Sequence, residues 1–474
     1  MACCEPQKGK THFVIIGGGS AAFAAAIKAS ELGAFVTLIN DGLPIGGTCV
    51  NVGCVPSKTL IRAAEAHHRS NNPNFLGISS RSDVTDFRKV IQQKREMVEE
   101  LRQAKYVDVV SDLPNFRIIE GRARFVAPKT VEVNGEIIEA AKILIATGAR
   151  QFVPVIPGLE ETDYLTNESL FELEELPESI IVLGGRYIAL ECAQMLARFG
   201  SQVTVLQRSS RILPTEMPDL TDDLTSYLSD EGMEIVTGVD IQRVGDVDGT
   251  VIVEAKVEGN LRSFQASRIL IATGREPNTS DLGLEENGVE LNDKGFVKVD
   301  ERLRTTAQDV YAAGDVIGEN MFVYTAAYEG NLAAENALAE GENERDYTAL
   351  PWVIFTDPQV AGVGLDEKQA AQKGFDAEVS TLPLTYVPRA IAARDTRGVI
   401  KLIRNRENDR LLGARILAPE GSELLMEVSL AIKYGITINE LISAFHPYLT
   451  LGEGIKLAAI AFGKDLEKLS CCAT

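Results

Sequence analysis

The stretch HFVIIGGGSAAFAAAI (residues 12–27) decides the fold. A short apolar strand leads into three consecutive glycines, Gly17 to Gly19, and then into an alanine-rich helix. Glycines at this place permit a tight turn and let the backbone approach a pyrophosphate, which then lies at the positive end of the helix. A second apolar run at residues 35–39 ends at Asn40. These elements predict a dinucleotide-binding unit.

The same plan occurs a second time along the chain. Residues 180–189, IIVLGGRYIA, repeat the strand and the glycine turn, and a helix through Phe199 and a strand at residues 202–206 follow. Each unit then ends in nearly the same strand, KILIATG at residues 142–148 and RILIATG at residues 268–274. Two such copies predict two dinucleotide folds in one α/β chain.

The end of the second strand in each unit discriminates between nucleotides. An acid there hydrogen-bonds a ribose 2′-hydroxyl, whereas a basic residue accommodates a 2′-phosphate. In the first unit Asn40 still offers a hydrogen bond, with Asp41 beside it. In the second unit Gln207 and Arg208 replace the acid and Arg211 follows, so the pattern favours NADPH over NADH.

Arg186 stands where the second turn would have its central glycine. A side chain at this place crowds a bound pyrophosphate, although a guanidinium could itself contact phosphate. We therefore expect the nicotinamide nucleotide site to be looser or shifted.

Length and composition are those of a water-soluble protein with several domains. The chain has 474 residues, 45% of them hydrophobic, and 68 acidic against 47 basic residues give a net charge of −21. Such a balance argues against binding to nucleic acid or to an anionic membrane. No apolar run approaches the roughly 20 residues that span a bilayer, and residues 1–10 lack the apolar stretch of a signal peptide. We expect a cytoplasmic protein.

Four of the seven cysteines form two close pairs, Cys49 with Cys54 and Cys471 with Cys472. In a reducing compartment such pairs are redox groups or metal ligands rather than structural bridges. A pair on a C-terminal tail can receive a disulfide or a thiophilic metal ion and pass it to the inner pair. The pattern alone leaves open which of the two is passed.

The other three cysteines carry weaker signals. Cys192 lies in an apolar helical pattern, which predicts a core position. Cys3 and Cys4 are adjacent on a polar N-terminus, and we interpret them as an inert frayed end, with metal scavenging as the alternative.

The segment GGTCVNVGCVPSK (residues 46–58) resembles the redox-disulfide helix of the pyridine nucleotide-disulfide oxidoreductases. TTAQDVYAAGDV (residues 305–316) resembles the second flavin motif of that family, whose acid is Asp315 here. The resemblance covers essentially the whole chain. It implies an FAD domain in two parts (1–150 and 278–345), an NADPH domain (151–277) and a C-terminal α+β dimerisation domain (346–474).

The resemblance also implies roles for individual residues. Cys54 would be the thiolate next to the flavin and Cys49 the interchange thiol, while Lys58 would pair with Glu191 near the flavin. Tyr187 would cover the flavin until the nicotinamide displaces it. The positions implied to contact FAD are Gly17, Gly19, Ala22, Asn40, Thr48, Lys58, Ala123, Thr147, Gly148, Asp315 and Val323. Those implied to contact NADPH are Gly184, Tyr187, Ala189, Gln207, Arg208 and Gly274.

The C-terminal motif departs from the disulfide reductases of this family. Their dimerisation domain carries His-Pro-Thr-x-x-Glu, in which the His moves protons to and from the interchange thiol. Here residues 446–453 read HPYLTLGE, so alignment on Thr450 and Glu453 puts Tyr448 at the His position and displaces His446 by two residues. Because a phenol titrates near about 10 and an imidazole near about 6.5, disulfide exchange loses its acid and base at neutral pH.

Loss of that base is consistent with a thiophilic dication as substrate. FTDPQVA (355–361), HPYLT (446–450) and LSCC (469–472) resemble the mercuric reductases of the family, and Tyr106 and Tyr448 match two tyrosines that line their metal site. This resemblance implies NADPH-driven reduction of Hg(II), delivered as thiol complexes, to Hg(0), a mercury-resistance and detoxification activity. In the implied homodimer, Cys471 and Cys472 of one subunit pass the ion to Cys49 and Cys54 of the other.

Three alternatives stay open. A large-type thioredoxin reductase explains the adjacent tail cysteines but lacks its histidine. A lipoamide dehydrogenase leaves the tail pair idle. A flavoprotein that only sequesters thiophilic metals leaves the NADPH fold unused.

Overall fold

The computed structural model describes residues 9–339 and 341–466. Cys3, Cys4, Cys471 and Cys472 lie outside the described residues. None of the described helices is both long and apolar enough to cross a membrane.

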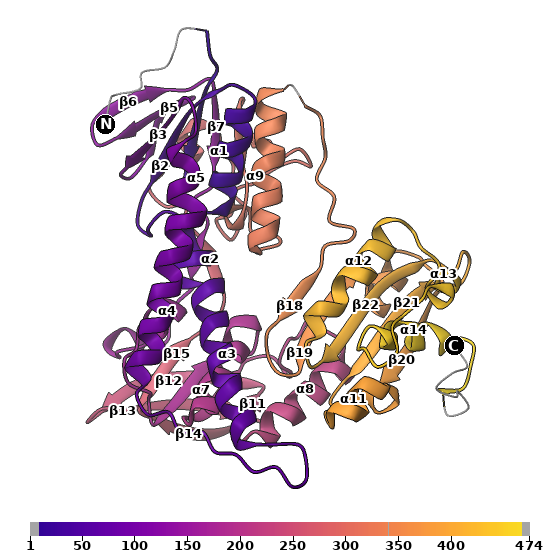
Figure 1. Cartoon of the computed structure of the whole chain (residues 1–474). Helices are drawn as coiled ribbons and strands as arrows, with labels where there is room; N and C mark the ends of the chain where they lie inside the picture. Colours follow the sequence, from indigo (N-terminus) through magenta and orange to yellow (C-terminus); the bar gives the residue numbers. More distant parts are fainter. Residues whose placement is uncertain (1–8, 340, 467–474) are drawn as a thin grey trace.

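The first dinucleotide unit is a five-stranded parallel sheet (Figure 1). Its order is β17-β7-β1-β2-β3. All five residues of β1 are buried, as expected for a parallel strand covered on both faces. The strands are β1 (His12–Ile16), β2 (Phe35–Asn40), β3 (Phe116–Glu120), β7 (Lys142–Ile145) and β17 (Val310–Ala312).

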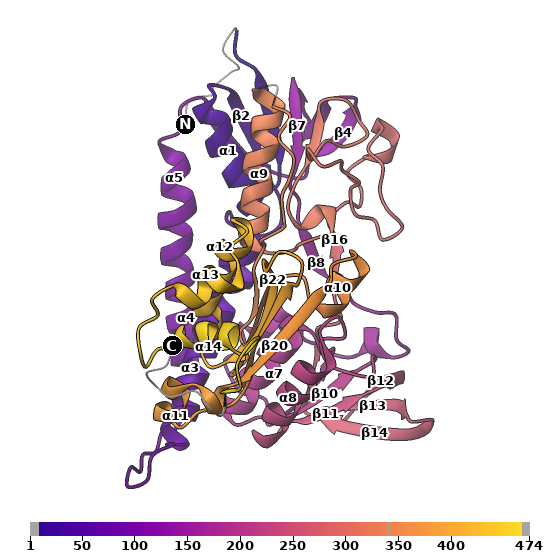
Figure 2. The same ribbon diagram turned by 90° about the vertical axis from the view of Figure 1, so that its right-hand side faces the viewer.

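Two helices distant in sequence lie side by side on this sheet, α1 (Ser20–Glu31) and α9 (Val323–Leu338) (Figures 1 and 2). They pack closely because α1 buries five alanines and α9 presents Gly330, where an added Cβ would lie 2.1 Å from the Ala21 carbonyl oxygen. The chain therefore leaves the first unit after β7 and returns to it at β17.

The second dinucleotide unit is a four-stranded parallel sheet of order β11-β10-β9-β15. This is the same order of first to fourth strands as β3-β2-β1-β7, so the internal repeat in sequence is a repeat in topology. Its elements are β9 (Ser179–Leu183), α7 (Tyr187–Phe199), β10 (Gln202–Gln207), α8 (Pro218–Asp230), β11 (Glu234–Thr237) and β15 (Arg268–Ile271).

Small antiparallel sheets decorate both units. One, in order β4-β5-β6, consists of β4 (Arg124–Ala127), β5 (Thr130–Val133) and β6 (Glu136–Glu139); another, in order β12-β13-β14, consists of β12 (Val239–Val247), β13 (Thr250–Val257) and β14 (Asn260–Ala266). A third pairs β8 (Ala149–Gln151) with β16 (Arg275–Pro277), which are the two segments that connect the units. Short helices are α6 (Asn167–Leu170) and the 3₁₀ turns Leu159–Glu161, Glu285–Asn287 and Asp315–Ile317.

Residues 352–460 form an antiparallel sheet with helices, in strand order β18-β19-β22-β21-β20. Its strands are β18 (Trp352–Ile354), β19 (Gln359–Gly364), β20 (Ala377–Pro383), β21 (Val399–Asn405) and β22 (Leu411–Ala418). Its helices are α10 (Glu367–Gln372), α11 (Pro388–Ala393), α12 (Leu425–Lys433), α13 (Ile438–Ser443) and α14 (Glu453–Ile460), with 3₁₀ turns Leu384–Tyr386 and Gly421–Leu424.

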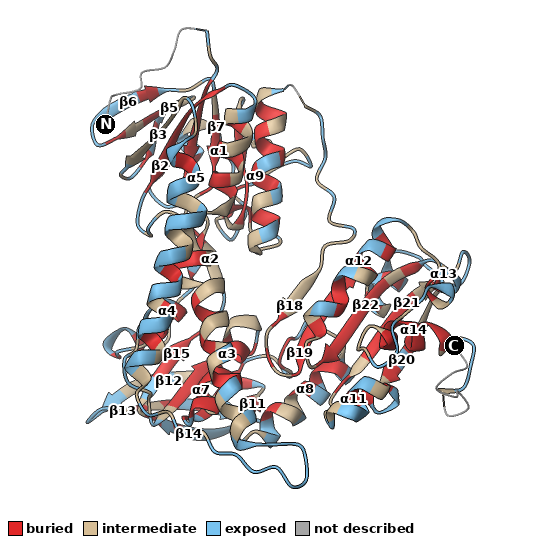
Figure 3. Cartoon of the chain, in the orientation of Figure 1, coloured by how far each residue is buried: buried red, intermediate tan, exposed pale blue. Residues whose placement is uncertain are grey.

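A series of helices connects the two dinucleotide units along one side of the molecule (Figure 1). They are α2 (Gly47–Val52), α3 (Cys54–Asn71), α4 (Phe87–Arg102), the π-helix Gln103–Val107 and α5 (Asp108–Ser111). The inner face of α3 is buried against α7, and Ile354, Val360 and Leu417 of the C-terminal sheet join the same core. Burial accordingly runs through the sheets and the inward faces of these helices (Figure 3).

The predicted α/β class with two dinucleotide folds and a C-terminal α+β domain is confirmed. One detail of the prediction was wrong. The repeated KILIATG and RILIATG segments are strands only over Lys142–Ile145 and Arg268–Ile271. Each strand stops there because its last residues turn toward a glycine loop, and Gly148 and Gly274 take φ of +70° and +137°.

Candidate active site

The inner cysteine pair lies where two helices meet. Cys49 is in α2 and Cys54 begins α3, and Gly53 separates the helices. Both thiols are free and half-buried. They are close enough to share a hydrogen bond, which lowers the pKa of Cys54 and raises that of Cys49.

The two thiols differ strongly in acidity. The hydrogen bond from Cys49 lowers the pKa of Cys54 to about 7, against the effect of burial, and the nearby Lys58 ammonium lowers it further. The pKa of Cys49 is raised because its proton is held in that hydrogen bond and because the thiol is buried. When the pair loses one proton, the negative charge therefore lies on Cys54.

Lys58, one turn along α3, connects three parts of the molecule. Its Nζ lies 2.7 Å from Glu191 Oε2 on α7, and it lies 4.6 Å from the centre of the Phe355 ring. The buried Glu191 carboxylate also accepts a 2.9 Å hydrogen bond from the Phe355 backbone N–H. The ion pair expected from the sequence is present, and its action on a flavin stays a prediction.

Tyr106 lies beside the sulfur pair. It is on the π-helix between α4 and α5, and its ring packs edge-on against Phe23 at 5.0 Å. Burial raises the pKa of Tyr106, a hydrogen bond with Ser20 lowers it, and negative charge at Cys49 and Cys54 raises it again. The structure therefore brings Tyr106 to the cysteines from a helix more than 50 residues further along the chain.

The C-terminal motif has the geometry expected for a displaced histidine. His446 Nε2 lies 2.6 Å from Glu427 Oε1, whereas the Glu453 carboxylate accepts a 3.2 Å hydrogen bond from the Leu449 N–H. His446 and Glu453 are thus bonded to other groups and form no pair. Tyr448 is 56% exposed, and within the described residues it makes no hydrogen bond to the cysteines of its own chain.

The first glycine turn requires glycine for two reasons. Gly17 has φ of +124°, and a Cβ there would lie 2.1 Å from the Ala146 carbonyl oxygen. The second unit repeats both features, since Gly184 has φ of +121° and its Cβ would lie 2.3 Å from the Ala272 carbonyl oxygen. The carbonyl at the end of each repeated strand thus closes against the turn and sets its shape.

The residues around the first turn fit a bound dinucleotide. Thr147 Oγ1 and Arg275 Nε are buried and have no hydrogen-bond partner within the part of the chain that the structure describes. Arg275 Nε lies 3.5 Å from Asp315 Oδ2, and burial raises the pKa of Asp315. Hydroxyl, guanidinium and carboxyl groups of this kind match the hydroxyls and phosphates of FAD.

The other positions expected to contact FAD come from several elements. Ala22 and Ala123 are buried small residues, and Gly148 follows Thr147 in the loop after β7. Gly19 is the N-cap of α1, Thr48 is in α2 and Val323 begins α9. The loops and helix starts at the carboxyl edge of the first sheet thus supply most of these positions.

The end of β2 lies beside a residue that the sequence patterns did not reveal, Glu120 at the end of β3. The Asn40 amide donates hydrogen bonds to the Leu43 carbonyl and to Glu120 Oε2, both at 3.1 Å, and Asn40 pairs with Glu120 in the sheet register. A carboxylate is therefore present beside Asn40, although it comes from β3. Only the knowledge that β3 neighbours β2 could have revealed Glu120.

The second unit presents basic side chains at the matching edge. Gln207 lies against Gly185, where a Cβ would be 3.1 Å away, and Ala189 is buried on α7. Arg208 is exposed and has no ion pair or hydrogen bond among the described residues. Arg211 lies 3.5 Å from Asp222, and its Nη1 is buried without a hydrogen-bond partner in the described chain.

Arg186 fits its position without backbone strain. It is the N-cap of α7 with φ of −110° and ψ of −169°, an extended conformation open to any residue. Its side chain is exposed. The backbone therefore does not require the glycine that the motif usually has here.

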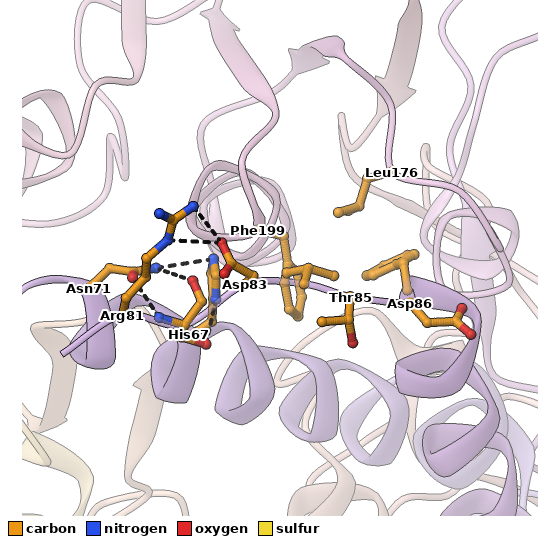
Figure 4. Close-up of a pocket in the computed structure, with 11 residues that line it drawn as sticks. His67, Asn71, Arg81, Asp83, Thr85, Asp86, Leu176 and Phe199 are labelled. Atoms are coloured by element: carbon orange, nitrogen blue, oxygen red, sulfur yellow. Dashed lines mark hydrogen bonds and ion pairs between the residues drawn. The ribbon is translucent and has the colours of Figure 1, made fainter.

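Figure 4 shows a surface hollow away from these groups, lined by α3, the loop of residues 72–86 and Phe199. His67 Nδ1 lies 3.0 Å from Ser82 Oγ, the Asn71 amide donates to the Ser82 carbonyl, and Arg81 pairs with Asp83. The bonds of His67 and Asn71 fasten the loop to α3, and we assign the hollow no activity.

No group of three or more His, Cys, Asp or Glu side chains within residues 9–339 and 341–466 is arranged to hold a metal ion. Cys49 and Cys54 therefore stand in the described structure as a two-sulfur site.

Comparisons with known proteins cover nearly the whole chain. The profile of the pyridine nucleotide-disulphide oxidoreductases matches residues 11–330, and that of their dimerisation domain matches residues 350–459. The chain is 43% identical to a mercuric reductase of Staphylococcus aureus, with 98% of this chain and 85% of that protein covered. It is 43% identical to a mercuric reductase of Streptomyces lividans, with 97% and 98% covered.

Solved structures share the fold. LpdA from Mycobacterium tuberculosis superposes with a TM-score of 0.85 at 28% identity and covers 96% of this chain and 100% of its own. The Cu(II) complex of the flavoprotein disulfide reductase RclA from Escherichia coli superposes with a TM-score of 0.83 at 34% identity, with 94% and 98% covered.

Proposed function

This chain belongs to the pyridine nucleotide-disulphide oxidoreductase family, and on that premise we propose that it is a mercuric reductase that uses FAD and NADPH. Several mercuric reductases are 41–44% identical to it over nearly its full length. The substrate would be Hg(II) bound to small thiols, and the product would be volatile Hg(0). A protein with this activity detoxifies mercury.

One observation supports this proposal above the others. The position of the proton-carrying imidazole is occupied by Tyr448, and His446 is bonded to Glu427 instead of Glu453. The sulfur pair itself is intact, with its charge on Cys54. Two sulfurs without an acid and base suit capture of a soft cation better than repeated disulfide exchange.

FAD would transfer electrons between the nicotinamide and the sulfur pair. The chain's own residues prepare that exchange. The turns at Gly17 and Gly184 would each hold a pyrophosphate at the start of a helix. The ion pair of Lys58 with Glu191 would place a positive charge where negative charge develops on reduction.

Capture of the metal would proceed by ligand exchange. The Cys54 thiolate attacks Hg(II) and displaces one small thiolate, which takes the proton that Cys49 releases as its sulfur displaces the second. The leaving thiolate thus replaces the missing imidazole as proton acceptor. Two electrons supplied by NADPH would convert the bound ion to Hg(0), which leaves. Both sulfurs would be released as thiolates, and Cys49 would then take up a proton from solvent, because its pKa is raised.

The nucleotide preference is part of the proposal. Arg208 is an exposed cation at the end of β10 with no partner among the described side chains, and Arg211 follows it. A 2′-phosphate would pair with these guanidinium groups, which favours NADPH over NADH.

The assembly would be a homodimer in which both subunits build each site. The chain carries the dimerisation domain of its family at residues 350–459. We propose domain boundaries at residues 150, 277 and 345, since the strands of the three large sheets fall on either side of them. Cys471 and Cys472 would deliver Hg(II) to Cys49 and Cys54 of the partner, with Tyr106 and Tyr448 lining the route and Glu453 supporting the turn before α14.

A disulfide reductase is the weaker alternative. LpdA and RclA share this fold, and RclA is described as a disulfide reductase and was solved with Cu(II). The relatives that match this chain at 41–44% identity are mercuric reductases, which does not favour a thioredoxin or lipoamide substrate.

The test is NADPH oxidation by the FAD-loaded enzyme with Hg(II) in excess thiol, oxidised thioredoxin or lipoamide in parallel. We expect rapid oxidation with Hg(II) together with loss of mercury from solution into the gas phase. Robust oxidation with a disulfide substrate alone would overturn the proposal.

A further inference from the structure

Four aromatic rings form a column where the two dinucleotide units and the C-terminal domain meet. Tyr324 and Phe322 lie at the start of α9, Tyr187 begins α7 and Trp352 begins β18. Successive ring centres are 5.4, 6.3 and 6.0 Å apart, and the planes differ by only 4°, 16° and 10°. Tyr187 is therefore stacked between Phe322 and Trp352.

Trp352 is held in place by groups other than Tyr187. It pairs with Gly362 on β19, where an added Cβ would lie 2.5 Å from the indole Cζ2. The Arg415 guanidinium lies 5.6 Å from the indole centre, and this buried side chain is itself fixed by a 3.0 Å ion pair with Glu216. The indole thus forms a wall whose orientation does not depend on Tyr187.

Phe322, on the other side of Tyr187, is connected to Trp352 through a neighbouring hydrogen bond. Phe322 stacks on Tyr324, whose hydroxyl donates a hydrogen bond to the carbonyl oxygen of Pro351, the residue before Trp352. Because this bond connects the start of α9 to the start of β18, the spacing between Phe322 and Trp352 is set by the fold.

Tyr187 itself is held more weakly. Within the described residues its hydroxyl makes no hydrogen bond, so its ring is held by packing against the stacked rings and the neighbouring core, and burial raises its pKa to about 12. It directly follows the glycine turn of the second unit, where a nicotinamide nucleotide must enter. Negative charge on Tyr187 and on Cys54 would each raise the pKa of Tyr324, so the stacked rings also lie close to the sulfur pair.

We propose that Phe322 and Trp352 form a fixed slot that holds the Tyr187 ring in the path of the nicotinamide. Trp352 is then a positioning residue, which sets how readily the Tyr187 ring moves aside when the nucleotide binds. The inference rests on the proposed function only in requiring a nicotinamide nucleotide to bind at the start of α7. It needs no mercury chemistry, so a failed mercury assay would leave it standing.

The first test uses the single tryptophan of the chain as a reporter in the FAD-loaded enzyme. Tyr187→Ala removes the ring stacked on Trp352 and should change the intensity of tryptophan emission without any nucleotide present. Phe75→Ala, at an aromatic residue of the loop between α3 and α4 that is 47% exposed, is the control and should leave the emission unchanged. Superimposable spectra of wild type and Tyr187→Ala would overturn the slot.

The second test is a double-mutant cycle on the dissociation constant of NADP⁺, measured from the perturbed flavin spectrum. Trp352→Ala should tighten NADP⁺ binding about two- to tenfold, the range expected for loss of one aromatic stack. In a Tyr187→Ala background the same change should have almost no effect. Trp352→Phe retains a ring and should bind NADP⁺ almost as wild type does.

Retained FAD and an unchanged unfolding temperature in Trp352→Phe would show that the site is intact. An equal effect of Trp352→Ala in both backgrounds would mean that the indole acts on the nucleotide directly. That result would contradict the proposal. So would an unchanged or a weakened affinity for NADP⁺ when Trp352→Ala is made in the wild-type background.

Discussion

Lys58 and Glu191 act on the Cys54 thiolate with opposite signs. The ammonium lowers the pKa of Cys54 and the carboxylate raises it, and the two groups are 2.7 Å apart. The acidity of the Cys54 thiol is therefore tuned by a pair that also reaches the C-terminal domain through Phe355. Substituting Lys58 or Glu191 singly should therefore shift the pKa of Cys54 in opposite directions.

The first prediction concerns the pH dependence of that thiolate. Since the pKa of Cys54 is about 7 and lies below that of an ordinary thiol, the thiolate should disappear as the pH falls through 7. Lys58→Met should move this transition to higher pH, and Glu191→Gln should move it to lower pH. Absorbance of the thiolate-to-flavin charge-transfer band in the two-electron-reduced enzyme measures the transition. Shifts of the same sign in both variants would contradict the assignment.

The second prediction concerns Arg208. Arg208→Ala should raise the KM for NADPH by about tenfold or more, because a charge-assisted hydrogen bond to the 2′-phosphate is lost. The KM for NADH should change little. Arg243→Ala, at an exposed arginine of β12 in the same domain, is the matched control and should leave both values unchanged. Equal losses with NADPH and NADH would mean that Arg208 does not read the 2′-phosphate.

At the scale of elements, a substitution in either glycine turn should impair one cofactor and spare the other. Alanine at Gly17 or at Gly184 meets a carbonyl oxygen within 2.3 Å and also takes a positive φ, a strain of about 1–3 kcal/mol before the clash is counted. We expect Gly17→Ala to be purified with little FAD. Gly184→Ala should keep its FAD, and NADPH should fail to reduce it in a stopped-flow experiment.

Two other glycines provide the controls for these turns. Gly33 and Gly200 also have positive φ, of +80° and +114°, but an added Cβ at either meets no atom within 4 Å. Their alanine variants should lose some thermal stability and keep both cofactors. Loss of FAD from Gly33→Ala would mean that backbone strain alone explains the Gly17 result.

Local patterns explain why the elements around these turns could be predicted from the sequence. The strand, glycine turn and helix of residues 12–27 are set by neighbouring residues, so β1, α1 and their repeats β9 and α7 lie where the periodicity indicates. Glu120 beside Asn40 and the slot around Tyr187 were missed. Each depends on strands or helices that meet across more than 70 residues, which no local pattern encodes.

The strand ends show the same limit on a smaller scale. Nothing in KILIATG marks the point at which the strand stops. The strand ends at Ile145, and the carbonyl of the next residue, Ala146, lies against Gly17. That contact joins residues distant in sequence. Motif recognition therefore located the two dinucleotide folds correctly, whereas the exact bounds of their strands required the three-dimensional structure.

At the scale of the whole molecule, the tail cysteines should matter only for the metal. Cys471→Ala with Cys472→Ala should slow turnover of Hg(II) supplied as thiol complexes, because the receiving ligands are lost. Reduction of the flavin by NADPH should continue at the wild-type rate. Cys3→Ala with Cys4→Ala is the matched control and should leave turnover unchanged. Loss of flavin reduction in the tail variant would reveal a structural role for these cysteines.

The last prediction concerns the exposed apolar face of the C-terminal domain. Met426 and Leu430 of α12 and its C-cap residue Tyr434 follow at spacings of four residues and are 56%, 46% and 72% exposed. Phe445, nearby in sequence, is fully exposed. A second copy of this domain is the occupant that the family's dimerisation domain indicates. Leu430→Arg should therefore weaken the dimer by about thirtyfold or more, since a charge would be buried in an apolar contact.

Analytical ultracentrifugation should show Leu430→Arg as a monomer at concentrations where wild type is a dimer. The monomer should still accept electrons from NADPH, because both dinucleotide units lie within one chain. If both subunits build each site as proposed, it should lose Hg(II) turnover, because the tail cysteines of the partner would no longer reach Cys49 and Cys54. Leu261→Arg adds the same charge at a leucine of β14 that is 66% exposed, and it should remain an active dimer. A monomer with full Hg(II) turnover would mean that each subunit completes its own site.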